Sequence, residues 1–148
     1  MTLDAVFKLL TFSAVFCALL AAHQVGDHWV QTHNQACMKG DRTKAGQVAC
    51  FTHVVWLIAT KAVALRLLMT VTGLTLDPWW LAAGLTVDAF SHYWADRRYT
   101  LARFAELIGK GDFYRLGAGH LGSGAYALDQ SWHVGWLFIT SLIISAGA

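Results

Sequence analysis

The chain has 148 residues, of which 56% are hydrophobic and only 14% are charged, and its formal net charge is +2. Soluble globular proteins carry about 25% charged residues, so this composition excludes an ordinary soluble enzyme and indicates an integral membrane protein. The length leaves room for one domain with about four spans of roughly 20 residues each.

Four apolar stretches are long enough to cross a bilayer as α-helices. We expect the first to be an uncleaved span, because it lacks the basic start of a signal peptide. Before the third, Asp77 can cap the helix and Pro78 suits its first turn. The predicted fold is therefore an all-α integral membrane four-helix bundle, with residues 1–148 forming a single transmembrane domain. Its helices are predicted at roughly 4–35, 46–72, 78–97 and 124–146.

Basic residues gather in two of the connections between these helices. The positive-inside bias places both connections in the cytoplasm, the membrane being the inner or plasma membrane, and both termini outside. The longer connection contains TLARFAELIG, in which Leu101, Phe104, Ala105 and Ile108 share one helical face. This pattern predicts a short interfacial helix between helices three and four. The basic residues are Lys39, Arg42 and Lys44 in the first connection and Arg97, Arg98, Arg103, Lys110 and Arg115 in the second.

Every predicted span also carries aspartate or histidine. Within a span these residues are spaced by four, which places them on one side of the helix. Helices one and three run inward and helices two and four run outward, so all of these residues fall in the cytoplasmic half of the bundle. The eight candidates are His23, Asp27, His53, Asp88, His92, Asp96, Asp129 and His133.

A shared metal centre explains why such residues meet in an apolar protein. Each ionisable group at this depth costs about 3 kcal/mol on insertion scales, and four clustered aspartates repel one another. Neutral imidazoles do not compensate that charge, so we predict a bound divalent metal. Mixed histidine and aspartate ligands suit zinc, with manganese or iron as alternatives. Eight candidates are enough for two ions, with the remaining carboxylates orienting the imidazoles.

Two other interpretations require no metal. The polar residues would form a hydrogen-bonded core that fixes helix packing, or they would line an ion or proton pathway. A pathway requires polar residues in the outer half, where the chain offers little beyond Lys61, Arg66 and scattered threonines. The corresponding alternative function is a non-enzymatic membrane protein, either an ion or proton conductor or a partner-binding factor of phage type.

The motifs resemble a known family. AHQVGDHWVQTHNQA, THVVW, DAFSHYWADRR and LDQSWH are similar to the bacterial and phage membrane family called domain of unknown function 3307, from about Leu19 to Leu142. More distantly, the arrangement looks like membrane-bound metal-dependent hydrolases of the zinc phospholipase C and P1 nuclease type. That resemblance implies that all eight candidates are ligands or near-ligands. The chain lacks the N-terminal Trp ligand of the soluble enzymes, which argues against a three-zinc site.

We therefore hypothesise a membrane-embedded metal-dependent hydrolase that acts on a phosphoester at the cytoplasmic leaflet. The metal would lower the pKa of a bound water to about 7 and hold phosphoryl oxygens. A non-ligating aspartate would act as base, with Asp96 and Asp27 as candidates. Arg97 and Arg98 would bind the remaining phosphate oxygens. Phospholipid head groups or nucleotides are the expected substrates, the bilayer is the expected partner, no specific nucleic-acid binding is expected, and the oligomeric state is left open.

Overall fold

A computed structural model describes residues 1–118 and 122–148, and in this part of the chain every regular element is helical. The all-α prediction is confirmed at that level. The elements are α1 (Leu3–Val25), the π-helical turn η1 (Gly26–Val30), α2 (His33–Met38), α3 (Lys44–Thr72), α4 (Pro78–Asp96), α5 (Tyr99–Leu107), α6 (Gly111–Arg115) and α7 (Gly124–Ala146).

The first helix differs from the prediction of one continuous helix over 4–35. α1 passes into η1, and the chain then leaves the helical conformation at Gln31, where ψ is 128°. Thr32 starts α2 with a capping box: its hydroxyl accepts the Gln35 backbone N–H at 3.2 Å, and the Gln35 side chain accepts the Thr32 N–H at 2.9 Å. This reciprocal pair stabilises a new helix start, so the break is encoded locally by Thr32 and Gln35.

The other long helices begin and end at ordinary capping residues. Thr43 starts α3, and Gly73 ends it with a φ of 73°, the left-handed conformation that glycine adopts without a Cβ penalty. Asp77 accepts the backbone N–H groups of Trp79 and Trp80 at the start of α4, with Pro78 at the first helical position. These caps leave a short connection between α3 and α4.

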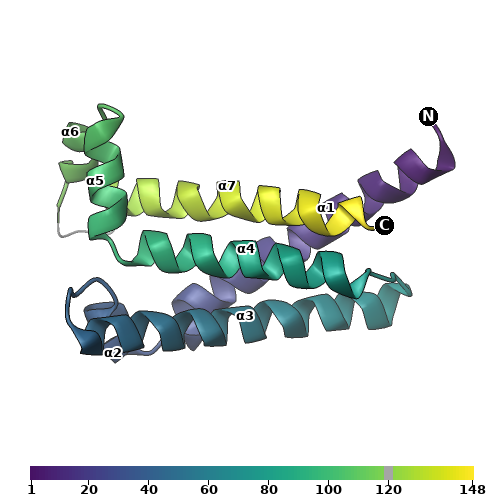
Figure 1. Cartoon of the computed structure of the whole chain (residues 1–148), viewed down its shortest axis with the longest axis horizontal. Helices are drawn as coiled ribbons and strands as arrows, with labels where there is room; N and C mark the ends of the chain where they lie inside the picture. Colours follow the sequence, from purple (N-terminus) through teal and green to yellow (C-terminus); the bar gives the residue numbers. More distant parts are fainter. Residues whose placement is uncertain (119–121) are drawn as a thin grey trace.

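The four long helices contact one another in a closed ring. α1 packs on α3 and α7, and α4 packs on the same two helices. Figure 1 shows α3, α4 and α7 lying lengthwise beside one another, with α1 crossing them obliquely. Buried aliphatic residues fill the half of the bundle away from the candidate site. They are Val15, Leu19, Leu65, Leu76, Leu137 and Ile144.

The two ends of the bundle differ. Both termini and the connection between α3 and α4 lie at one end, whereas α2, α5 and α6 lie at the other (Figure 1). α5 crosses that end with Leu101 and Ala105 buried beneath it, so the predicted short helix is present between α4 and α7. The basic connections therefore share one end of the molecule.

Two helices are long and apolar enough to cross a membrane among the residues that the structure describes: α1 continued through η1, and α3. Only 22% of the apolar window of each is buried within the protein, so neither resembles the core helix of a soluble domain. Large apolar side chains instead cover the outside of α3, among them Phe51, Trp56, Val63 and Leu67. α4 and α7 carry much of the aspartate and histidine set, which lowers their hydropathy.

Candidate metal centre

Three elements bring four ligand-type side chains together beneath α2. Asp27 comes from η1, His53 from α3, and His92 and Asp96 from one side of α4, where they are four residues apart. All four are buried. Gly26 allows η1 to approach α3 closely, because a Cβ there would lie 2.4 Å from the Leu57 Cδ1 atom. The wide π-helical turn then directs Asp27 inward, a use of such turns that recurs at functional sites.

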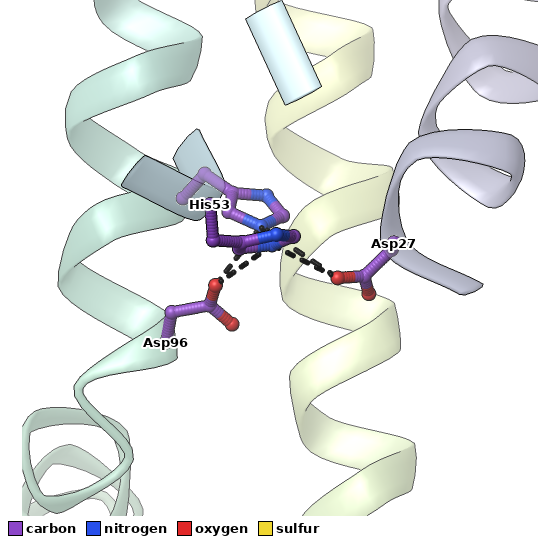
Figure 2. Close-up of side chains that lie close together, drawn as sticks. Asp27, His53 and Asp96 are labelled. Carbon is purple, nitrogen blue, oxygen red and sulfur yellow. Dashed lines mark hydrogen bonds and ion pairs between the residues drawn. The ribbon is translucent and has the colours of Figure 1, made fainter. Parts of the chain in front are cut away.

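The ligand atoms of these four residues face one another at short range. The His53 Nε2 lies 3.1 Å from the Asp27 Oδ1, 3.2 Å from the Asp96 Oδ2 and 3.1 Å from the His92 Nε2. The His92 Nε2 lies 3.2 Å from the Asp96 Oδ2 and 4.0 Å from the Asp27 Oδ1. Figure 2 shows the Asp27 and Asp96 carboxylates reaching the His53 ring from opposite sides.

These separations match the edges of a small tetrahedron. Ligand atoms about 2.05 Å from a central zinc ion in tetrahedral geometry are roughly 3.3 Å apart. The five separations between the nitrogen and oxygen atoms of this cluster run from 3.1 to 4.0 Å, on both sides of that length. Hydrogen bonding alone explains the arrangement poorly, because the His53 Nε2 carries at most one proton but lies against two carboxylate oxygens and another imidazole nitrogen. Within the described structure the Asp96 Oδ2 is buried and has no hydrogen bond, although two imidazole nitrogens lie 3.2 Å away.

Lys39, which is predicted in the first basic connection, completes this cluster. The Lys39 Nζ lies 2.8 Å from the Asp96 Oδ1 and 3.5 Å from the Asp27 Oδ1, and the residue is only 7% exposed. Burial alone lowers the pKa of Lys39, but the two carboxylates outweigh that effect and raise its pKa above the ordinary value. Lys39 is therefore a fixed cation that neutralises one carboxylate charge.

A second group shares Asp96 with the first. Its members, Asp96, Asp129 and His133, have ligand atoms within 4.8 Å of one another. The His133 Nε2 lies 3.5 Å from the Asp129 Oδ1 and 3.9 Å from the Asp96 Oδ1. The ring of His23 lies 5.0 Å from that of His133 and 5.5 Å from that of His92. His23 is fully buried, and neither ring nitrogen has a hydrogen-bond partner in the described structure.

Asp88 lies apart from both groups, in contrast to its predicted place among the ligands. Its Oδ2 accepts a hydrogen bond from the Lys61 Nζ at 2.6 Å, and Lys61 is completely buried. Lys61 and Asp88 approach each other where α3 and α4 pack together. Asp88 is therefore the charge partner of Lys61, and the ladder on α4 divides into an ion-paired residue and two residues of the cluster.

The two arginines predicted to bind substrate have different surroundings. Arg97 is 2% exposed, and its guanidinium donates to the backbone oxygens of Lys39, at 2.9 Å, and of Asp41. It ties the end of α2 to the end of α4 and has no free face for a phosphate. Arg98 is exposed, donates to the Ala36 oxygen at 2.7 Å, and adopts a φ of 55° that is unfavourable for a residue with a Cβ.

The predicted support for the imidazoles is missing from the described structure. The Nδ1 atoms of His53 and His92 are buried without a hydrogen-bond partner. Metal-bound histidines usually donate that N–H to a carboxylate or carbonyl. Polar support reaches the carboxylates instead, since the Gln130 Nε2 lies 3.4 Å from the Asp27 Oδ2 and 3.3 Å from the Asp129 Oδ2.

A cavity of about 540 Å³ opens onto the cluster at the end of the bundle that carries α2, α5 and α6. Its walls include the carboxylates of Asp27, Asp96 and Asp129 and the cationic side chains of Lys39 and Arg98. Tyr114 also lines it, and burial together with the Asp129 carboxylate raises the pKa of that phenol. A polar molecule in this cavity would contact both buried acids and two cations.

The sequence does not point to two residues of this site, Lys39 and Gln130, or to the neighbouring Lys61–Asp88 pair. It places Lys39 among the basic residues of the first connection and Lys61 among the few polar residues of the outer half, and it does not single out Gln130. The signal for Lys61 was a lysine in the middle of an apolar span that must find an acid at the same depth. For Lys39 no local signal exists, because α2 folds back onto α3 through long-range contacts.

Comparison with known proteins places the chain in one family. No curated protein and no solved structure matches it significantly. The family model described as a protein of unknown function, DUF3307, matches residues 15–147, which include every residue of both groups. The chain belongs to the DUF3307 family of proteins of unknown function.

Proposed function

We propose that α1 with η1, α3, α4 and α7 all span a membrane, with α2, α5 and α6 at its cytoplasmic face. α4 is the shortest of the four, and its 19 residues extend about 28 Å at 1.5 Å per residue, close to the thickness of the hydrocarbon core. The basic residues of both connections lie at the same end, which supports this orientation through the positive-inside bias. α5 then lies at the inner interface.

We further propose that Asp27, His53, His92 and Asp96 hold one divalent metal ion. Four buried or half-buried aspartates, Asp27, Asp88, Asp96 and Asp129, meet two buried lysines, Lys39 and Lys61, which leaves two negative charges uncompensated. One divalent cation balances them. Two nitrogen and two oxygen ligands at near-tetrahedral separations favour zinc over manganese, which prefers more oxygen ligands. The group of Asp96, Asp129 and His133 is the place for a second ion if two are bound.

The function that this geometry supports best is metal-dependent hydrolysis of a phosphoester. The four side chains would fill a tetrahedral zinc shell, so turnover would require the ion to accept a fifth ligand, either a water that it acidifies or a phosphoryl oxygen that it polarises. Asp27 and Asp96 are occupied as ligands in this arrangement, so Asp129, which lines the cavity, takes the role of general base. Lys39 and Arg98 offer positive charge to the phosphate, and Arg97 holds the end of α2 in place. The convergence of four ligand atoms beside a cavity is the observation that carries the proposal.

A second candidate function is a polar core that only fixes helix packing. The pairs that Lys39 and Lys61 make with aspartates favour it, because they compensate much of the buried charge without any ion. The two candidates differ in metal content. A structural core predicts a stable protein without metal, whereas the metal centre predicts stoichiometric uptake.

Metal analysis of the full chain purified in detergent tests the proposal. We expect about one zinc ion per chain, lost in His53→Ala and retained in His33→Ala, which removes an exposed histidine that belongs to neither ligand group. Hydrolysis of bis-p-nitrophenyl phosphate by the zinc-loaded protein tests the reaction. Bound zinc without turnover would contradict the proposed hydrolase function but not the proposed metal centre. A wild type that binds no metal would contradict both.

A further inference from the structure

An apolar groove lies beside the charged cavity. It has a volume of about 330 Å³ and runs between α5 and α7. Its walls include Phe104 and Ile108 from α5, and Trp132, Trp136 and Ile139 from α7. None of the residues that line it is charged. A groove of this composition accepts a hydrocarbon chain and rejects an ionic group.

The groove and the cavity share one wall residue. Leu101 of α5 lines both of them, so the apolar groove lies next to the polar cavity. α5 lies across the end of the bundle that carries the cavity (Figure 1). The cavity is polar and the groove is apolar, and Leu101 forms part of the wall of each. A ligand that fills both parts must be an amphiphile of matching polarity.

The charges of the cavity and the apolar wall of the groove also fit one class of molecule. The cavity wall carries the Lys39 and Arg98 cations and three carboxylates, so a divalent ion held by the ligand cluster would make its net charge positive and suit a phosphate. The groove wall is held in place by aromatic packing, since the Trp132 ring stacks on Trp94 at 4.6 Å and meets Phe104 edge-on at 5.7 Å. Volumes of about 300–1,000 Å³ are typical of ligand pockets, and both parts fall in that range.

We propose that the ligand is a membrane phospholipid, with its phosphate in the cavity and one acyl chain in the groove between α5 and α7. This inference rests on the proposed hydrolase function and narrows its substrate class, because nucleotides lack an acyl chain to fill the groove. The groove holds the lipid in register, so that the phosphoester bond lies beside Asp129 and the ligand cluster. The groove contributes by positioning the lipid, since the acyl chain already lies in the apolar bilayer before it binds.

Gly135 provides a selective way to close the groove. It lines the groove on α7, and a Cβ at this position would meet no atom within 4 Å. A phenylalanine there has room to enter the groove without displacing the helix core. Val134, the residue before Gly135 on α7, is exposed and does not line the groove, so Val134→Phe is a control that introduces the same side chain outside the groove.

The test uses the full chain in phosphatidylglycerol vesicles that contain a phosphatidylglycerol with a photoreactive diazirine in its acyl chain. After irradiation, we expect labelled peptides from α5 and α7 around Phe104, Trp132 and Trp136. Gly135→Phe should reduce this labelling at least tenfold, and Val134→Phe should leave it unchanged. Gly135→Leu serves as a smaller replacement if the phenylalanine variant unfolds earlier in a thermal scan.

Two results would overturn the inference. Even labelling of the outer faces of α1, α3 and α7 would mean that lipid only surrounds the protein. Groove labelling that is absent from a dimer fraction and appears only after dilution to the monomer would mean that a second copy covers the groove. The labelling readout needs neither metal nor turnover. Groove labelling in a metal-free protein would therefore contradict the hydrolase alone, and a zinc-loaded protein that cleaves the soluble diester without groove labelling would contradict the lipid assignment alone.

Discussion

The Lys61 ammonium donates a hydrogen bond of 2.6 Å to the Asp88 carboxylate, and both side chains are buried between α3 and α4. This pair accounts for two charges in the apolar part of the bundle. It also separates Asp88 from His92 and Asp96 at the next turns of α4. The cluster of Asp27, His53, His92 and Asp96 is thus left as a compact set with one fixed cation, Lys39, beside it.

The Lys61–Asp88 pair predicts a large and specific stability effect. Lys61→Met leaves the Asp88 carboxylate buried without a partner, which we expect to cost roughly 3–5 kcal/mol of unfolding free energy. The double variant Lys61→Met/Asp88→Leu removes both charges and should recover most of the loss. Thermal unfolding in detergent measures both. Equal destabilisation by the single and double variants would contradict the assigned pairing.

An exposed ion pair offers the matched comparison. Lys8 and Asp4 lie 3.4 Å apart one turn from each other on α1, with side chains 43% and 70% exposed. Lys8→Met should change the unfolding free energy by about 0–1 kcal/mol, as expected for exposed pairs. A larger loss of unfolding free energy in Lys61→Met than in Lys8→Met would then be due to the burial of the Lys61–Asp88 pair.

Arg97 and Arg98 should separate structural from substrate-binding effects. Arg97→Ala removes donors to the Lys39 and Asp41 carbonyls, and we expect a loss of roughly 3–6 kcal/mol of unfolding free energy, because each of the two hydrogen bonds from a charged group contributes about 1.5–3 kcal/mol. Arg98→Ala should raise KM for a phosphoester with a much smaller change in unfolding temperature. Steady-state kinetics and thermal scans of both variants provide the comparison. A reversed pattern would show that Arg97 is the residue that meets substrate.

Asp129 should be needed for turnover but not for metal uptake. Asp129→Asn retains the shape and size of the side chain and removes the proton acceptor, so we expect kcat to fall by about 10²–10⁴ with zinc content unchanged. Asp112→Asn, on an exposed carboxylate that pairs only with Arg115 in the described structure, is the control. Loss of zinc in Asp129→Asn would instead identify Asp129 as a ligand.

Metal removal should destabilise the wild type and spare the ligand variants. An ion that binds only the folded state at 100 times its Kd contributes about 2.7 kcal/mol. We expect chelation to lower the unfolding temperature of the wild type and zinc to restore it, with neither treatment affecting His92→Ala. If chelator does not change the unfolding temperature of the wild type, that result would favour the structural polar core.

The convergence of Asp27, His53, His92 and Asp96 could be predicted from sequence because it depends on two regular features. Spacing by four fixes which side chains share a helix face, as His92 and Asp96 do. The alternation of helix direction then places His53 and Asp27 at the same depth. Both features are local or topological, and neither requires knowledge of side-chain contacts.

The assignment of partners could not be predicted, because it depends on contacts between distant segments. Asp88 has the same spacing from His92 as Asp96 has, yet Lys61 of α3 lies against one and Lys39 lies against the other. The burial of Lys39 requires the break at Gln31 and the return of α2 onto α3. Thr32 and Gln35 form a helix-start pattern in the sequence that the prediction of one helix over 4–35 does not use.

X-ray absorption spectroscopy at the zinc edge of the purified, zinc-loaded chain tests the central claim most directly. We expect a first shell of four nitrogen and oxygen ligands at about 2.0–2.1 Å, with the outer-shell scattering of two imidazoles that disappears in the double variant His53→Ala/His92→Ala. A shell of six oxygens without imidazole scattering, or zinc retained by that double variant, would contradict the account.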